Sequence, residues 1–286
     1  MNKSKFKSRL VIGSANFTQK YGVNPIKINY EENIKILKFA KKNGINQIDT
    51  ADAYLGKHNV FKDIDKDFKF STKVTPDKKW TSLENSKKKI EDHFKYLNSN
   101  SIETLLFHSD KILFTKNGKK IFKNLELLKK KKYFKKIGIS IYDTSSLKFI
   151  TSNYNLNVVQ CPYNFLDRRI ITSNWFDKLK SQSIEIHARS VFLKGILVNK
   201  SLYKKKYFNK WKNFFKKWFK ILEYNKISPV DYCLNDLTIH DFDKIIIGVN
   251  NHKNLRQIVN FKIIQKNKMI SLNTNDKNLI DPRRWK

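Results

Sequence analysis

Gln47-Ile48-Asp49-Thr50-Ala51-Asp52-Ala53-Tyr54 is the stretch that decides the fold of this 286-residue chain. The apolar run from Ile45 to Ile48 predicts a short buried strand, and polar side chains begin where that strand ends. In a parallel α/β barrel the carboxyl ends of the strands meet at one mouth, where active sites lie. We therefore expect Asp49 and Tyr54 to face the same opening.

Two further polar side chains belong to later predicted strands. Lys73 lies inside Ser71-Thr72-Lys73-Val74, and His108 follows the apolar run Leu105-Leu106-Phe107. An Asp, a Tyr, a Lys and a His are thus placed at or near the ends of three consecutive early strands. We expect these four side chains to form one site.

Short apolar strands alternate with helical patterns along the rest of the chain. Strands are predicted over residues 9–13, 45–48, 68–74, 102–108, 137–141, 158–161, 184–190 and 244–248. Helices are predicted over residues 30–43, 82–97, 118–131, 144–152, 174–182, 228–237 and 252–264. Alternation of this kind is typical of parallel sheets, and eight units favour a closed (β/α)8 TIM barrel. We expect a single domain with its core at about residues 9–264.

Three segments depart from the minimal barrel. The connection between Tyr54 and Phe68 is short for a full helix, and residues 265–286 form a C-terminal tail. Residues 201–227 form an insertion between the seventh strand and its helix. In that insertion aromatic and aliphatic residues recur at helical spacing between lysines, at Phe208, Trp211, Phe215, Trp218 and Leu222. Such an amphipathic helix can lie on a membrane, but packing on its own domain is the commoner use and the favoured interpretation.

Composition sets limits on the class of protein. The formal charge is +34, yet the chain has 52 lysines against seven arginines, whereas sites that read nucleic acid favour arginine. We expect no specific nucleic-acid partner. There is no apolar run long enough for a transmembrane helix or a secretion signal. Cys161 and Cys233 lie among apolar neighbours without metal-ligand spacing, which predicts reduced thiols, no metal site and a cytoplasmic protein.

The four polar side chains suggest a reaction. A tyrosine is a weak acid near neutral pH, but a neighbouring ammonium favours its phenolate, and a carboxylate can hold that ammonium in place. A histidine can orient a substrate oxygen. Such a site protonates an oxygen that is becoming an alkoxide, as carbonyl reduction requires. No side chain supplies a hydride, so a nicotinamide cofactor is implied.

From about Leu10 to Ile264 the chain resembles the aldo/keto reductases. The block from Ile48 to Tyr54 is similar to that family's Asp/Tyr signature, and the Lys73 and His108 strands match its lysine and histidine strands. Three later motifs follow in the family's order: Ile137-Gly138-Ile139-Ser140, Val159-Gln160-Cys161-Pro162-Tyr163-Asn164 and Ile246-Ile247-Gly248-Val249-Asn250.

The resemblance implies a role for each matching residue. Tyr54 is the expected general acid, Lys73 and Asp49 tune its pKa, and His108 orients the carbonyl. Ser140 and Gln160 are expected to hold the nicotinamide, with Ser14 near it. The remaining expected cofactor contacts are Arg189, Ser190, Gly248, Lys253, Asn254 and Arg256.

Some positions depart from the family pattern. Ile141 stands where many members carry an asparagine, and Arg189 stands where an aromatic ring often stacks under the nicotinamide. Asn254 replaces an arginine that many NADPH-specific members use on the 2′-phosphate, and Lys253 or Arg256 could substitute. NADPH is the expected cofactor, and NADH stays open.

The resemblance extends to a bacterial branch associated with spore-coat and cell-surface polysaccharide biosynthesis. Tyr21-Gly22-Val23, residues 160–169 and residues 186–197 are similar to it. An aldehyde or ketone, including a sugar-derived one, is the expected substrate of a monomer or weak oligomer. Two other readings stay open: a cofactor-binding regulatory or scaffold barrel without turnover, and a protein that binds polyanions or membrane surfaces through residues 201–227.

Overall fold

Eight parallel strands close into a barrel in the computed structural model, which describes residues 3–18, 23, 29–56, 59–265 and 272–285. Tyr21 and Gly22 lie outside the described residues. The strands, which follow one another around the barrel in chain order, are β1 (Leu10–Gly13), β2 (Gln47–Asp49), β3 (Lys69–Val74), β4 (Ile102–Phe107), β5 (Phe134–Ser140), β6 (Val158–Pro162), β7 (Glu185–Arg189) and β8 (Lys244–Gly248). The predicted (β/α)8 barrel is confirmed.

The barrel closes through β1. Ile12 is paired with Ile48 of β2 on one side and with Ile247 of β8 on the other. All three side chains are buried, which explains why these strands are continuous apolar runs in the sequence. Between β5 and β6 the backbones approach so closely that a Cβ on Gly138 would lie 2.3 Å from the carbonyl oxygen of Val158.

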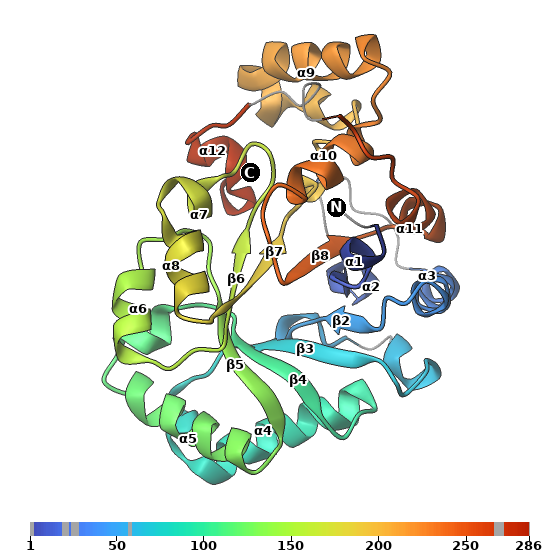
Figure 1. Cartoon of the computed structure of the whole chain (residues 1–286). Helices are drawn as coiled ribbons and strands as arrows, with labels where there is room; N and C mark the ends of the chain where they lie inside the picture. The colour runs from blue at the N-terminus through green and yellow to red at the C-terminus, as the bar shows by residue number, and fades with distance from the viewer. Residues whose placement is uncertain (1–2, 19–22, 24–28, 57–58, 266–271, 286) are drawn as a thin grey trace.

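Helices surround the barrel and extend beyond one of its ends (Figure 1). They are α1 (Lys3–Lys7), α2 (Ala15–Thr18), α3 (Tyr30–Lys42), α4 (Leu83–Leu97), α5 (Gly118–Lys130), α6 (Leu147–Asn153), α7 (Arg169–Thr172), α8 (Trp175–Ser181), α9 (Lys212–Tyr224), α10 (Pro229–Leu237), α11 (His252–Val259) and α12 (Lys277–Ile280). Local signals in the sequence explain several boundaries. The Ser228 side chain accepts a hydrogen bond from the backbone of Asp231 and caps α10, with Pro229 in its first turn.

The connection after β2 is as short as the sequence indicated. It holds two 3-10 turns, η1 (Asp52–Tyr54) and η2 (Val60–Asp63), in place of a full helix. Tyr54 is therefore fixed within one turn of the end of β2. The other 3-10 turns within the described residues are η3 (Lys78–Thr81), η4 (Lys111–Phe114), η5 (Leu193–Gly195), η6 (Leu202–Lys204), η7 (Lys206–Trp211) and η9 (Pro282–Arg284).

The last predicted helix is too long by five residues, since α11 ends at Val259 rather than at Ile264. After the end of α11, backbone N–H groups donate to side chains of α10 and not to helix carbonyls. Asp231 accepts from the backbone N–H of Lys262, and Asn235 accepts from that of Ile264. These contacts hold residues 262–264 as a non-helical connection.

Residues 201–227 do not form one continuous helix, which corrects that expectation. They form η6, η7 and α9, and the break falls at Lys205, whose backbone is extended. The aromatic stripe packs inward. Trp218 is fully buried, its ring stacks on Phe165 at 4.2 Å, and its indole N–H donates to the carbonyl of Leu197 at 3.2 Å. The packing interpretation of the stripe is confirmed.

The aromatic stripe belongs to a second hydrophobic cluster beside the barrel core. The C-terminal tail joins it, because Leu279 and Ile280 of α12 are buried in this cluster. Figure 1 shows α9, α10 and α12 together at one end of the molecule. Among the described residues, no helix combines the length and apolar character needed to cross a membrane.

One ion pair at the opposite end of the barrel gives a stability prediction. Glu185, at the start of β7, contacts Nε2 of His187 at 3.2 Å and Nζ of Lys136 on β5 at 2.6 Å. These two partners lower the pKa of Glu185 from 4.5 to about 2, against the opposing effect of burial. The stabilisation is therefore present above pH 4.5 and is lost as the pH falls toward 2.

We expect Glu185→Gln to lower the free energy of unfolding by roughly 1 kcal/mol at pH 7, a value discounted for the partial exposure of the group. The difference from the parent protein should shrink between pH 4.5 and pH 3, as measured by urea unfolding at several pH values. A difference that stayed constant or grew on acidification would contradict this account.

Candidate functional site

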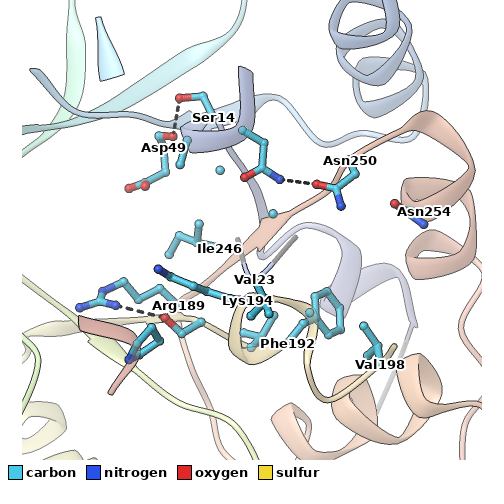
Figure 2. A pocket seen from close by; sticks show the side chains of 18 of the residues that line it. Ser14, Val23, Asp49, Arg189, Phe192, Lys194, Val198, Ile246, Asn250 and Asn254 are labelled. Atoms are coloured by element: carbon cyan, nitrogen blue, oxygen red, sulfur yellow. Dashed lines mark hydrogen bonds between the residues drawn. The ribbon is translucent and has the colours of Figure 1, made fainter. Parts of the chain in front are cut away.

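A cavity of about 650 Å³ opens at the carboxyl end of the strands. Its size lies within the range of small-molecule and cofactor sites, about 300–1,000 Å³. The lining residues come from the ends of β1 to β5, β7 and β8, from α2, α10 and α11, from the loop after β7 at residues 190–202, and from the C-terminal segment. Figure 2 shows Ser14, Asp49, Arg189 and Asn254 placed around this space.

The four residues predicted from the sequence all line this cavity: Asp49, Tyr54, Lys73 and His108. Lys73 of β3 and Asp49 of β2 form a buried ion pair, and the ammonium also donates to the carbonyl of Thr50 at 2.9 Å. The register of β2 against β3 places them together, since Asp49 is opposite Ser71, two residues before Lys73. Alternation along a strand then turns both side chains to the same face.

Burial lowers the pKa of the Lys73 ammonium, while Asp49 opposes that shift through its charge and its hydrogen bond. Arg189 adds to the lowering as a nearby like charge. The site therefore holds a desolvated lysine that is ion-paired with a buried carboxylate. A lysine in this state acts strongly on an adjacent acid, because little water screens it.

Tyr54 is held over this pair by the η1 turn. Nζ of Lys73 lies 5.7 Å from the centre of the Tyr54 ring, and the His108 ring stands edge-on to it at 6.0 Å. The tyrosine is half-buried, so its ring faces the cavity with one side against protein. Lys73 and His108 thus both lie beside the Tyr54 ring, and all three side chains line the cavity.

Asp52 supports this arrangement, a role that the sequence reasoning missed. Its carboxylate accepts from the backbone of Ala53 at 2.7 Å and of Thr75 at 2.8 Å, tying η1 to the end of β3. Nδ1 of His108 lies 3.9 Å from it. Burial raises the pKa of Asp52, but the contacts with His108, Thr75 and Ala53 outweigh it and the pKa is lowered.

Gln160, which the sequence predicts to hold the nicotinamide together with Ser140, hydrogen-bonds to two other residues of the site. It is fully buried on β6 and is not among the residues lining the cavity. Its Nε2 donates to Asp49 at 2.8 Å, and its Oε1 accepts from the hydroxyl of Ser140 at 3.2 Å. Gln160 therefore fixes the carboxylate of Asp49 from below, whereas Ser140 reaches the cavity.

The far end of the cavity is lined by amides from the loop after β8. Asn250 accepts from the side chain of Asn16 at 2.7 Å, and Asn254 and Gln257 also line this end. Lys253 and Arg256, both expected at the cofactor, are exposed and are not among the lining residues. The guanidinium of Arg256 lies instead over the ring of Phe39, at 5.7 Å.

Other expected contacts do line the cavity: Ser14, Arg189, Ser190 and Gly248. The sequence reasoning missed Asn16, Tyr142, Lys194 and Arg283. Lys194 and Ser190 have left-handed backbones, with φ of 52° and 60°. Strained backbone of this kind is concentrated at functional sites. A serine or a lysine in the sequence does not indicate a left-handed backbone, so these positions could not be predicted.

Neither cysteine is a candidate nucleophile. Both are buried, and burial raises the pKa of Cys161 to about 12. In the described part of the chain, no three His, Cys, Asp or Glu side chains converge as metal ligands would.

Comparison with known proteins gives a family match. Residues 9–269 match the sequence model described as the Aldo/keto reductase family. A glycerol dehydrogenase from Gluconobacter oxydans shares 16% identity with a TM-score of 0.67, covering 91% of this chain and 88% of that one. The holo form of an aldo-keto reductase from Bacillus halodurans shares 17% identity with a TM-score of 0.71, covering 94% of each chain. No curated protein sequence matches.

Proposed function

The chain belongs to the aldo/keto reductase family, whose members reduce carbonyl compounds with nicotinamide cofactors, and we propose that Tyr54, Lys73, Asp49 and His108 catalyse that reaction here. The observation that supports this proposal is the buried Lys73–Asp49 pair beneath a cavity that Tyr54 and His108 also line.

Each of the four side chains has a task in this proposal. A reduced nicotinamide, when bound, supplies the hydride that adds to the carbonyl carbon. The Tyr54 hydroxyl donates its proton to the carbonyl oxygen as the C=O π bond breaks, which leaves a tyrosinate. The Lys73 ammonium stabilises that tyrosinate electrostatically, and solvent later returns the proton. His108 donates a hydrogen bond that orients the carbonyl oxygen toward Tyr54.

The residues of the cavity suit a dinucleotide. The Ser140 hydroxyl can bind the nicotinamide carboxamide close to the Tyr54–Lys73 end. At Gly248 a Cβ would meet no atom within 4 Å, so the open backbone of this lining residue leaves room for a ligand. Ser14, Ser190, Asn250 and Asn254 extend the polar lining toward α11.

The amide-lined end bears on the choice between NADPH and NADH. A charge-assisted hydrogen bond is worth about 1.5–3 kcal/mol, or roughly 10- to 150-fold in affinity. Lys253 and Arg256 lie outside the lining, so we propose that NADPH is used without strong discrimination against NADH. The expected ratio of the two dissociation constants is within about tenfold, from fluorescence titrations at one ionic strength. A preference for NADPH beyond a hundredfold would contradict this reading.

We also propose a polar substrate, in which a sugar-derived aldehyde or ketone is included. The support is the resemblance of residues 160–169 and 186–197 to the polysaccharide-associated bacterial branch. The test is cofactor titration followed by oxidation of NADPH or NADH in the presence of a panel of aldehydes and sugar-derived ketones. Turnover supports the reductase. Tight binding without turnover on any carbonyl would favour a regulatory barrel, and absence of binding would refute the cofactor site.

A further inference from the structure

The cavity carries more positive charge than its ion pairs neutralise. Its charged lining residues are one carboxylate, Asp49, and five cations: Lys73, Arg189, Lys194, Lys200 and Arg283. Asp49 pairs with Lys73, and two of the other cations have partners outside the lining, Lys200 with Glu223 and Arg283 with Asp281. The abundance of lysine on the surface does not explain the two arginines at this cavity, because the chain has only seven arginines.

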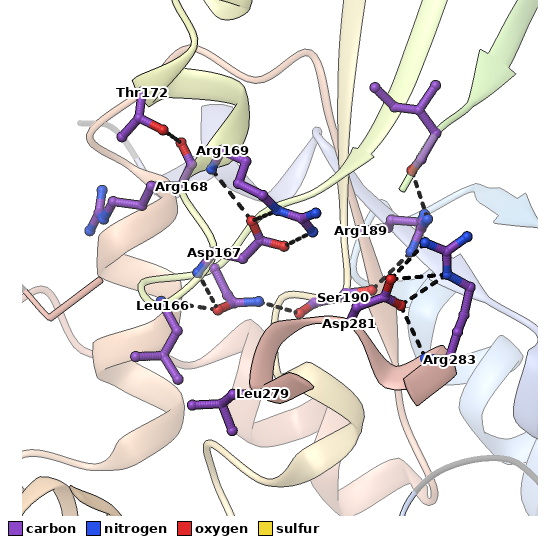
Figure 3. Close-up of polar contacts among 12 residues, drawn as sticks. Leu166, Asp167, Arg168, Arg169, Thr172, Arg189, Ser190, Leu279, Asp281 and Arg283 are labelled. Carbon is purple, nitrogen blue, oxygen red and sulfur yellow. Dashed lines mark hydrogen bonds and ion pairs between the residues drawn. The ribbon is translucent and has the colours of Figure 1, made fainter. Parts of the chain in front are cut away.

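Those two arginines meet on one aromatic ring. The guanidinium carbon of Arg189, at the end of β7, lies 4.2 Å from the centre of the Tyr142 ring, and that of Arg283, in η9, lies 3.7 Å from it. Tyr142 itself follows β5. Figure 3 shows Arg189 and Arg283 approaching each other from β7 and from the C-terminal segment, with Asp281 beside them. Three distant segments therefore build one cationic corner.

The hydrogen-bonding capacity of this corner is only partly used. Arg189 donates to two neutral oxygens, the carbonyl of Ile141 at 2.8 Å and the hydroxyl of Ser190 at 3.1 Å. Among the described residues, it has no carboxylate within ion-pair distance. A half-buried guanidinium without a counterion is costly, and a bound anion would relieve that cost.

Arg283 is held in place while one of its nitrogens stays available. Its Nε and Nη2 donate to the carboxylate of Asp281 at 2.6–3.1 Å, and its backbone N–H also contacts Asp281 at 3.1 Å. Within the described residues, Nη1 has no acceptor. The side chain is 52% exposed at the rim of the cavity, where an incoming molecule can reach it.

The position of this corner is next to the place where the carbonyl substrate has to bind. Tyr142 lies two residues after Ser140 of β5, the proposed contact of the nicotinamide carboxamide, and the substrate carbonyl must meet the nicotinamide at that end. From there the proposed cofactor lining runs past Ser190, Ser14 and Gly248 to Asn254. Figure 2 shows Arg189 on one side of the cavity and Asn254 on the other. Arg283 is thus across the mouth from the cofactor's adenosine end.

We propose that the carbonyl substrate carries an anionic group, a carboxylate or a phosphate, which Arg283 binds at the rim with Arg189 below it. The planar fork of arginine matches both groups. This inference rests on the proposed reductase function and adds the substrate's charge to it. The reducing step itself is unchanged.

The test compares matched carbonyl pairs. D-Glyceraldehyde 3-phosphate is paired with D-glyceraldehyde, and succinic semialdehyde with butanal, each followed through NADPH oxidation. The anionic member of at least one pair should have the higher kcat/KM, and the pair that shows it distinguishes phosphate from carboxylate. Arg283→Gln should reduce this anion-to-neutral ratio by roughly 10- to 100-fold, mainly through KM.

Arg284→Gln is the matched control, because Arg284 is the neighbouring arginine and does not line the cavity. It should leave the ratio unchanged. If Arg283→Gln does not fold, as judged by its melting temperature, Arg283→Lys replaces it and should give a smaller loss of the same ratio, since the charge stays and the fork is lost.

Three results would overturn the inference. The parent protein could show no preference for either anionic substrate, or the folded Arg283 variant could keep the parent's anion-to-neutral ratio. The variant could also lose NADPH affinity by the same factor as it loses this ratio, which would assign the corner to the cofactor's phosphates. Failure of the reductase function would look different, because no carbonyl of either charge would be reduced by the parent protein.

Discussion

The Tyr54→Phe variant is expected to reduce carbonyls roughly a thousandfold more slowly than the parent protein, within the range of about 10²–10⁴ for loss of a general acid. The substitution removes only the hydroxyl that donates the proton. The ring stays against His108 and above Lys73, so the cavity keeps its shape. The loss should therefore fall on kcat, and the dissociation constant for NADPH should stay within about twofold.

The control for this variant makes the same chemical change outside the cavity. Tyr203→Phe alters a buried tyrosine of the second hydrophobic cluster, which does not line the site, and should keep parent turnover. If Tyr54→Phe kept more than a tenth of the parent kcat, another group would have to be the acid. Lost cofactor binding in that variant would show that Tyr54 acts in binding.

Lys73→Met is expected to lower both activity and stability. Without the ammonium, the tyrosinate that forms at Tyr54 is no longer stabilised, and we expect kcat to fall at least about a hundredfold. The carboxylate of Asp49 would also be left without its cation in a buried position. Breaking a buried pair in this way costs about 3–5 kcal/mol, which a urea unfolding experiment can detect.

A double variant separates these two effects. In Lys73→Met/Asp49→Asn the buried charge is gone, while the new amide oxygen can still accept from Nε2 of Gln160, as Asp49 now does. Stability should recover by more than half, and activity should not recover. Recovery of activity together with stability would mean that Lys73 serves only the fold.

Much of the fold follows from periodicity. Strands buried on both faces appear in the sequence as unbroken apolar runs. Ile245-Ile246-Ile247 is such a run, and the sequence predicts the strand around it, residues 244–248, at the bounds of β8. The misplaced boundaries have tertiary causes. Asp231 and Asn235 end α11 early by hydrogen-bonding the chain beyond it, and nothing in residues 252–264 themselves indicates that contact.

The residues of the candidate site likewise include some that the sequence could predict and some that depend on tertiary contacts. Asp49, Tyr54, Lys73 and His108 could be predicted to share a cavity because each lies at the end of, or shortly after, one of the strands β2 to β4, and a parallel barrel brings these strand ends together. Arg283 could not, because its place in the cavity depends on how the C-terminal segment folds back. Lys253, Asn254 and Arg256 of α11 are all exposed, and of the three only Asn254 lines the cavity, a difference that depends on how α11 packs and not on residue type.

The most direct test of the proposed function is transfer of the hydride itself. The purified protein would be given cofactor carrying deuterium at the transferable position of C4, together with the best carbonyl from the panel, and the alcohol analysed by mass spectrometry. The proposal predicts one deuterium on the carbinol carbon and oxidised cofactor in equal amount. Alcohol formed without deuterium, or bound cofactor that is never oxidised with any carbonyl, would contradict it.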